Sequence, residues 1–406
     1  MQRPDNLQPT TSSTPLWAMP FRPAFLLAGC WAIIAISIWL AQLSGFIQGA
    51  AGLSGTLWHV HEMLFGFAAL VAVGFLLTAA QNWTQILVLH SRWLMGWSLL
   101  WLIARLLAFT EPLASTGHNL LLLALAQGSW WLLGISALCR QLWLARSQRN
   151  YQFVLMLTGM ALLNLLFLRQ STNGHYLQAL HLGHSMILLF GVLMGVLGGR
   201  VIPFFTARAT NTPQCQAPRL DLLILVSAIA GTLGFISSIW WSWLNPGWLM
   251  LLVAALHLLR LGYWFTPKLL AQPLLWSLHF ANLALAVGLA LMAIALLFAP
   301  AVLPRPTLFK DALHLVGISA MAGMMLAMMA RVALGHTGRP LQVSRLLALA
   351  FALITLSGVL RAAAGLFSQP HLSWYASAGL WLASFAIFTR VYWPILTSAR
   401  LDGRPG

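Results

Sequence analysis

Histidines and carboxylates recur in pairs, three residues apart, inside hydrophobic stretches of this chain. The pairs are His59 with Glu62, His181 with His184, and Asp311 with His314. Residues i and i+3 lie on one face of a helix, so both members of a pair can point the same way. Because ionisable side chains are costly in lipid and rare there, such pairs indicate a functional site inside a membrane.

Five histidines near the starts of these stretches are candidate metal ligands: His59, His61, His181, His184 and His314. Neutral imidazole binds copper, iron and zinc, and haem iron takes axial histidines. Acidic residues are few, which argues against calcium or magnesium. The alternative is a set of interfacial histidines that contact water at the membrane surface.

Two carboxylates accompany these histidines, and we treat Glu62 and Asp311 as candidate catalytic residues. Each can pass protons to a bound substrate, or accept a hydrogen bond that orients a histidine ligand. A third interpretation is that each stabilises the N-terminal end of a helix dipole. The position of Asp311 beside Lys310, near the start of its span, suits that third interpretation as well as the first two.

A second set of side chains is predicted at the opposite membrane face. Its members are His279, His336, Arg200, Arg331 and Arg339. Arginine pairs well with carboxylates and phosphates, so haem propionates or anionic lipid headgroups are candidate partners. The alternative is that these arginines only set the topology of the chain. The mid-span His257 is expected to be an isolated, hydrogen-bonded core histidine.

Twelve apolar runs must position these residues. The chain has 406 residues, of which 60% are hydrophobic and only 7% are charged, against about 25% charged in soluble proteins. A membrane span needs about 20 apolar residues, and runs of that length begin near residues 24, 58, 93, 119, 151, 175, 220, 247, 273, 308, 343 and 372. We therefore predict an all-α, polytopic membrane protein. The net charge of +16 is assigned to loops that face the cytoplasm, with no nucleic-acid partner.

The distribution of Lys and Arg sets the predicted orientation. Seventeen of them lie at the chain ends or in even-numbered loops and three in odd-numbered loops, so both termini are expected to be cytoplasmic. The predicted organisation is a cytoplasmic segment (1–23), a twelve-helix transmembrane domain (24–396) and a cytoplasmic tail (397–406). The second, sixth and tenth spans then carry their histidines in the outer half of the membrane. Their spacing of four helices suggests a threefold pseudo-repeat.

Four sequence strings resemble the NnrS family. They are FRPAF at 21–25, WHVHEMLFGF at 58–67, GFLLT at 74–78 with NWT at 82–84, and RVALGHTGRPL at 331–341. The resemblance runs from about residue 20 to the C-terminus. It implies a twelve-span protein that contains haem and copper and acts in denitrification and the response to nitric oxide. A looser likeness to the catalytic subunit of haem–copper oxidases fails at the seventh span, which has no histidine here.

The expected function is a multi-pass protein of the inner membrane that binds b-type haem and copper and handles nitric oxide. No entry point for electrons is visible, so the electron donor is unknown, and sensing, repair of metal nitrosyls and reduction stay open. Two rival interpretations are a transporter for copper or a small solute, and an assembly factor for another metalloenzyme.

Overall fold

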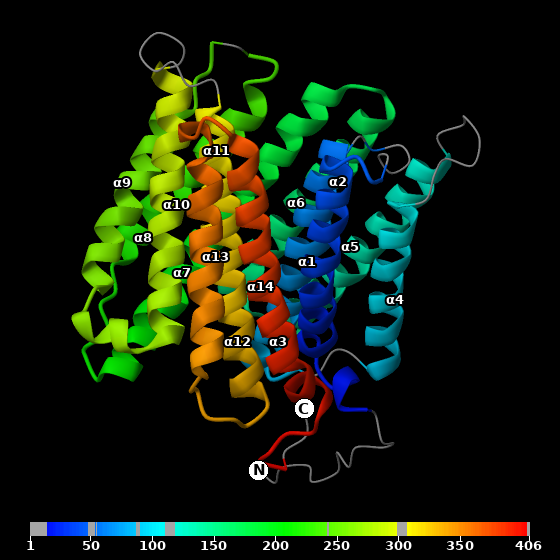
Figure 1. The fold of residues 1–406 in the computed structure, drawn as a ribbon. Coiled ribbons are helices and arrows are strands. Elements are labelled where there is room, and N and C mark those ends of the chain that lie inside the picture. Colours follow the sequence, from blue (N-terminus) through cyan, green and yellow to red (C-terminus); the bar gives the residue numbers. More distant parts are fainter. Residues whose placement is uncertain are drawn as a thin grey trace.

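The computed structural model describes residues 14–47, 53, 55–86, 90–109, 118–241, 243–298 and 307–403. These residues form a bundle of roughly antiparallel helices, and none of them lies in a strand (Figure 1). The helices that make single spans are α1 (Phe21–Leu43), α4 (Ser91–Leu107), α5 (His118–Leu144), α6 (Tyr151–Thr172), α7 (Tyr176–Thr210), α8 (Pro218–Ser237), α9 (Gly247–Trp264), α10 (Pro273–Phe298), α13 (Arg345–Ala362) and α14 (Pro370–Thr397).

Two further spans are built from three consecutive pieces each. The second span joins α2 (Gly55–His61), the π-helix η2 (Glu62–Ala68) and α3 (Ala69–Thr84). The tenth span joins α11 (Leu308–His314), the π-helix η5 (Leu315–Ala322) and α12 (Gly323–His336). Short 3-10 helices η1 (Pro15–Trp17), η3 (Gln148–Asn150), η4 (Pro267–Ala271) and η6 (Ala364–Leu366) occupy connections between spans.

Helix length and composition confirm the membrane class. Among the described residues, 11 helices are long and apolar enough to cross a bilayer. The remaining rod, α4, has 17 residues, which is at the short end of the range for a span. The chain is therefore a multi-pass membrane protein with the predicted arrangement of spans.

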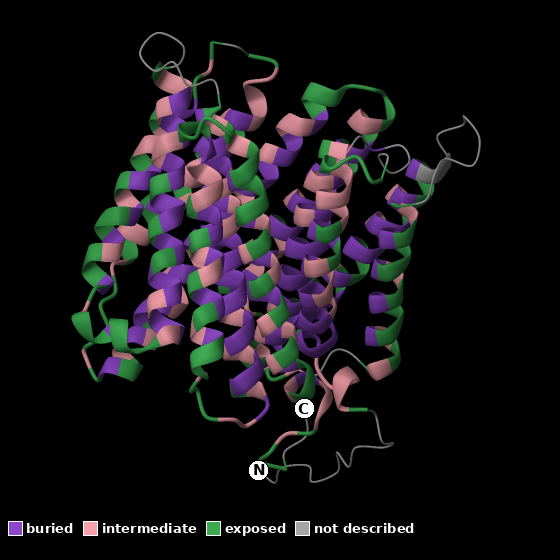
Figure 2. Cartoon of the chain, viewed as in Figure 1, coloured by how far each residue is buried: buried purple, intermediate pink, exposed green. Residues whose placement is uncertain are grey.

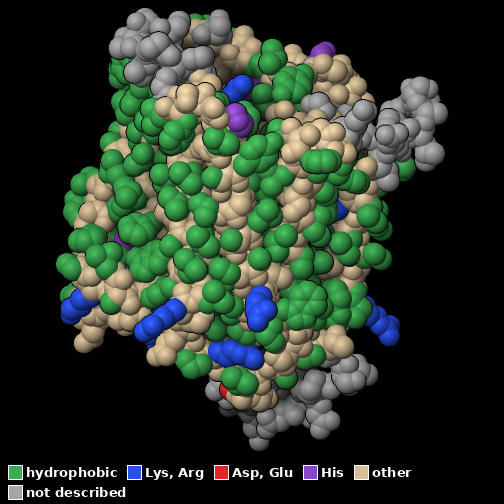
Figure 3. All heavy atoms as spheres, viewed as in Figure 1, with side chains coloured by type: hydrophobic (Ala, Val, Ile, Leu, Met, Phe, Trp, Pro, Cys, Tyr) green, Lys and Arg blue, Asp and Glu red, His purple; other side chains and the backbone are tan. Residues whose placement is uncertain are grey.

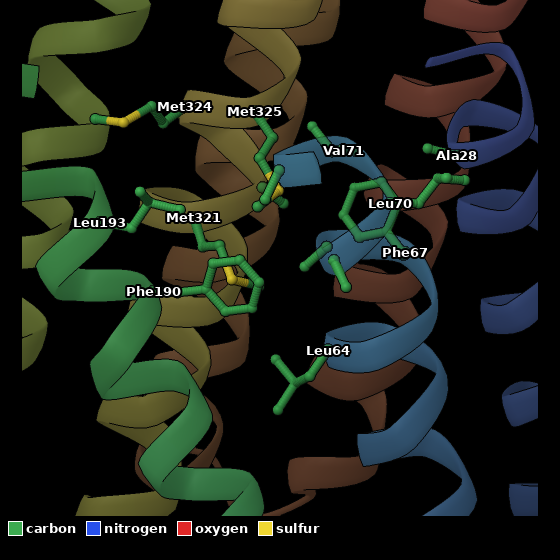
Figure 4. Close-up of a cluster of buried hydrophobic side chains, with 14 of the residues drawn as sticks. Ala28, Leu64, Phe67, Leu70, Val71, Phe190, Leu193, Met321, Met324 and Met325 are labelled. Atoms are coloured by element: carbon green, nitrogen blue, oxygen red, sulfur yellow. The ribbon is translucent and has the colours of Figure 1, made fainter. Parts of the chain in front are cut away.

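The spans that carry the paired histidines form the interior of the bundle. The most apolar window is 89% buried in Gly55–Thr84, 83% buried in Leu308–His336 and 61% buried in α7, whereas α8 reaches only 28%. Figure 2 shows the same gradient, with buried residues in the middle and exposed ones on the outer helices. Figure 4 shows side chains of these spans, including Phe67, Phe190 and Met321, packed in one apolar cluster. The methionines of the tenth span are thus packing residues.

The first and last helical spans begin and end, respectively, at the same end of the bundle. The Nη1 atom of Arg22, at the start of α1, donates to the carbonyl oxygens of Leu396 (2.9 Å) and Ser398 (2.8 Å). Leu396 lies in the last turn of α14, and Ser398 follows the helix. Figure 3 shows Lys and Arg side chains gathered toward this same end. The arrangement matches the charge pattern of the sequence, and the assignment of this end to the cytoplasm stays a prediction.

Two of the three histidine-bearing spans each contain a π-helix. Both π-helices follow directly on the residues that could do chemistry: η2 begins at Glu62 and η5 begins after His314. The described part of α7 has no π-helix. The threefold pseudo-repeat therefore stays a prediction, with a structural likeness only between the second and tenth spans.

Candidate functional site

Imidazoles from three separate spans lie in the same half of the bundle, away from the N- and C-terminal helix ends. The ring of His314, on α11, lies within electrostatic range of His59 on α2 and His184 on α7. Both α2 and α11 lie toward the end opposite the termini in Figure 1. The sequence could place these rings only at equal depth. In the structure α2 packs against α7 and α7 packs against η5, so the three spans that carry the rings are in contact.

His314 and His59 each have one ring nitrogen that is open to a ligand. The Nδ1–H of His314 donates to the carbonyl oxygen of Lys310 at 2.7 Å, which leaves Nε2 with its lone pair. The ring of His59 stacks on Trp39, with 4.6 Å between the ring centroids. Its Nδ1 is buried and has no hydrogen-bond partner in the described part of the chain. Stacking thus orients the His59 ring and a backbone hydrogen bond orients the His314 ring, and each ring keeps one nitrogen without a hydrogen bond.

The ring of His184 packs against Phe309, with centroids 5.6 Å apart. Its neighbour in the sequence pattern, His181, has a different environment. The Nε2–H of His181 donates to the carbonyl oxygen of Phe235 at 2.8 Å, and its ring stacks on that of Phe235 at 4.4 Å. Phe235 lies in the last turn of α8, where backbone carbonyls lack helical partners. His181 therefore stabilises the end of α8.

A second buried group surrounds His61. Its Nδ1 lies 2.7 Å from Glu62 Oε1, and both side chains are fully buried. The ring packs between Phe65 and Phe167, at centroid distances of 5.5 and 5.9 Å. Its Nε2 has no hydrogen-bond partner among the described residues. His61 thus lies apart from the His59 ring, as expected for helical residues two positions apart.

An arginine and a glutamine complete this group. Arg105 Nε lies 3.1 Å from Glu62 Oε2, and its Nη2 donates to Gln127 Oε1 at 2.6 Å. Gln127 Nε2 in turn donates to the carbonyl oxygen of Phe65 at 3.1 Å. Phe65 lies in η2, where the change in helical pitch leaves backbone carbonyls to be satisfied by other groups. This series of polar contacts, from Glu62 through Arg105 and Gln127 to the Phe65 carbonyl oxygen, therefore neutralises a buried charge and stabilises the π-helix.

The other candidate carboxylate has a similar partner. Asp311 Oδ1 lies 3.0 Å from Arg361 Nη1, and Asp311 is nearly buried. The guanidinium of Arg361 also lies over the ring of Trp374, 5.2 Å from its centroid. Arg105 and Arg361 were missed as site residues by sequence analysis. Their signal in the sequence is that both lie inside apolar runs, apart from the other Lys and Arg residues, but their partners lie 43 and 50 positions away.

Comparison with known protein families identifies the family of the chain. The family model for NnrS protein matches residues 15–400, nearly the whole chain. The chain belongs to the NnrS family. This membership supports a role in the nitric oxide response. No curated protein matches the chain.

The predicted inner-face residues of this NnrS-family chain contact separate neighbours. His336 Nε2 lies 3.1 Å from Asn82 Nδ2, and His279 Nδ1–H donates to the Leu275 carbonyl oxygen at 3.0 Å. The three arginines contact different partners: Arg331 lies 3.6 Å from the Phe205 ring centroid, Arg339 Nη2 donates to Ser398 Oγ, and Arg200 Nη1 donates to Asn150 Oδ1. The structure does not bring these five residues into one set of contacts.

The outer histidines likewise stop short of a closed coordination site. Within the described residues, no three His, Cys, Asp or Glu side chains are close enough to hold a metal ion. The arrangement offers separate imidazole nitrogens on converging helices. Binding of one metal by three of these rings would require the side chains to move closer together.

Proposed function

We propose that this protein binds a redox metal, as haem iron or copper, through His59, His184 and His314, and there interacts with nitric oxide. The observation that supports this proposal is that His59 and His184, from the second and sixth spans, both lie within electrostatic range of His314 on the tenth. The lipid environment does not favour burial of several imidazoles near one another, because each polar ring would be more stable near water. Family membership supplies the link to nitric oxide.

The available donors suit a haem or copper ion. Haem iron needs only one or two axial imidazoles, and the lone pair on His314 Nε2 and the unpartnered His59 Nδ1 meet that need. Copper bound by imidazoles needs further donors at the same point, and His184 is a further histidine within electrostatic range of His314. When bound, such a metal supplies a coordination site for nitric oxide and a route for electron exchange.

The two carboxylates are proposed to position other groups. Glu62 accepts a hydrogen bond from His61 Nδ1–H, which directs Nε2 of that ring away from the carboxylate. A partner of this kind is typically worth 10–100-fold in metal affinity when the histidine it orients is a ligand, but His61 is not one of the three proposed ligands, so Glu62 is proposed to orient a neighbouring buried ring. Asp311 neutralises Arg361, the cation that lies close to His59 and His314. Without Asp311 the guanidinium would repel a bound metal cation.

The test is metal analysis of the purified full-length protein in detergent, by optical spectrum and elemental analysis. We expect His59→Ala, His184→Ala and His314→Ala each to weaken metal binding by at least about tenfold, since a ligand should matter no less than an outer partner. His371→Ala is the matched control, because His371 is exposed at the start of α14.

Full metal retention in all three folded variants would exclude this histidine set. A folded wild-type protein that neither carries nor takes up haem or copper would exclude the metal proposal itself, and would favour transport of a small solute. We place the protein in the inner membrane of the cell, with the histidine cluster toward the outer face.

A further inference from the structure

A second candidate site lies at the opposite, arginine-rich end of the bundle. A cavity of about 620 Å³ lies between the start of α6, the middle of α7, the first half of α8 and the interior of α9. Its volume is within the range of small-molecule sites, about 300–1,000 Å³. The histidine cluster is not among its lining residues, so the two sites are separate. His257, expected from the sequence to be an isolated, hydrogen-bonded core histidine, is buried and lines this cavity.

The mouth of the cavity is polar and cationic. It is lined by Arg149 and Arg200 and by the amides of Asn150, Gln152, Gln214 and Gln216. Asn150 Oδ1 accepts a hydrogen bond of 2.7 Å from Arg200 Nη1, and the Arg149 carbonyl oxygen accepts one of 3.3 Å from Arg200 Nη2. The Arg200 guanidinium also lies over the Phe153 ring, 5.0 Å from its centroid. Arg200 is thus held in place at the mouth.

The inner part of the cavity is mostly apolar. Gly191, Gly195 and Gly199 of α7 lie along one wall, and Val192, Val196 and Ala228 line it further. A second, small cavity shares Gly191, Val192, Ala228 and His257 with the first and continues toward Thr232 and Met250. The space therefore narrows from a polar mouth to a slim apolar end.

The third arginine beside the cavity, Arg260, is already paired with a carboxylate. Arg260 Nη1 donates to Asp221 Oδ1 at 2.9 Å and to the Gly195 carbonyl oxygen at 3.0 Å. Arg260 Nη2 donates to His257 Nδ1 at 3.2 Å. An added Cβ at Gly199 would lie 2.9 Å from Arg260 Nη1, so the glycine permits this close approach. Since His257 Nδ1 is engaged, that nitrogen is not a free ligand for a metal.

The charge of the mouth is not balanced by the described chain. All four described carboxylates have an arginine partner: Glu62 with Arg105, Asp221 with Arg260, Asp311 with Arg361, and Asp402 with Arg400. Arg149 and Arg200 lie close enough to repel each other, and neither forms an ion pair with a described carboxylate. Two neighbouring guanidinium groups at the edge of a cavity form a site for an anion.

We propose that this cavity binds an amphipathic anion, with a phosphate or carboxylate group at Arg149 and Arg200 and an apolar body along Gly191 to Ala228. A phosphate or carboxylate forms bidentate hydrogen bonds with guanidinium groups, and the amides supply further donors. The anion can come from a lipid headgroup or from a soluble metabolite. The site does not depend on a metal at the histidine cluster.

The test uses calorimetric titration of the full-length protein in neutral detergent with phenyl phosphate, benzoate and benzyl alcohol. Mass spectrometry of the purified protein measures retained phosphatidylglycerol. A soluble anion source predicts saturable binding of phenyl phosphate or benzoate but not of benzyl alcohol. A lipid source predicts retained phosphatidylglycerol that phenyl phosphate does not displace.

Three variants test whether the anion binds in this cavity. Arg200→Gln should weaken binding or lipid retention about tenfold or more, as expected for loss of a charged hydrogen bond. Arg208→Gln should change neither, because Arg208 is exposed on the same helix and does not line the cavity. Val196→Trp should block the apolar part while leaving both arginines in place, so it decides the matter even if Arg200→Gln fails to fold. Wild-type protein that binds neither probe nor lipid, or equal binding by Val196→Trp and wild type, would overturn the proposal.

Discussion

At the scale of single residues, the main finding is that buried charges are matched in pairs. Glu62 and Arg105 are both fully or almost fully buried, and each contacts further polar groups. A buried ion pair contributes little net stability compared with apolar residues, but removal of one partner leaves an unpaired charge in a medium of low dielectric constant. The pair is therefore sensitive to substitution on either side.

We expect Glu62→Gln to lower the free energy of unfolding by about 3–5 kcal/mol, because Arg105 would lose its counter-charge. The double variant Glu62→Gln with Arg105→Gln should recover part of this loss. Thermal unfolding in detergent measures both. Asp402→Asn is the control, because its pair with Arg400 is partly exposed and should contribute at most about 1 kcal/mol. An unfolding temperature equal for Glu62→Gln and wild type would show that the buried pair is not needed.

At the scale of elements, the π-helix η5 depends on glycines in the two helices that pack against it. Gly358 of α13 lies against η5, and a Cβ there would collide with Ser319 Oγ and lie 2.6 Å from the Ser319 backbone nitrogen. Gly288 of α10 is equally close to η5, since its Cβ would lie 2.5 Å from Val316 Cγ2. The wider turn of a π-helix thus requires glycine on both neighbouring helices.

We expect Gly358→Ala to destabilise the protein by about 1–3 kcal/mol, the usual effect of overpacking. Gly317→Ala is the matched control within η5, because no atom lies within 4 Å of the added Cβ. Alanine there should be neutral or slightly stabilising. The measurement is again thermal unfolding in detergent. Equal unfolding temperatures for the two variants would contradict a close fit between α13 and η5.

At the scale of the whole molecule, the bundle has one cationic end and an opposite end that carries His59, His184 and His314. The first span begins and the last span ends at the cationic end, where Arg22 connects α1 to the segment after α14. The positive-inside rule assigns this end to the cytoplasm. The proposed metal site and the proposed anion site would then face opposite sides of the membrane.

Cysteine labelling tests this orientation. Cys215 is exposed between α7 and α8 at the cationic end, and Asn173 is exposed between α6 and α7 at the other end. In cells whose protein has Cys30 and Cys139 replaced by serine, we expect a membrane-impermeant maleimide to label Cys215 only after permeabilisation. An Asn173→Cys variant should be labelled in intact cells. The opposite pattern would invert the topology and place the histidines in the cytoplasmic half.

Local properties of the sequence were sufficient to predict the class of fold. The length of each apolar run and the breaks between runs depend only on neighbouring residues and on the thickness of a bilayer, so twelve rods were predictable. The depth of His59, His184 and His314 followed from their positions near span ends. Family membership followed from motifs such as residues 58–67, and the family match confirmed it.

Contacts between distant spans decided the rest. Only packing shows that His181 stabilises the end of α8 while His314 keeps a free nitrogen, because both occupy similar places in the sequence pattern. Only packing pairs Arg105 with Glu62 and leaves Arg200 beside a cavity without a described counter-ion. The reason is physical: hydropathy depends on the composition of one helix, whereas the partner of a buried polar group depends on which helix lies against it.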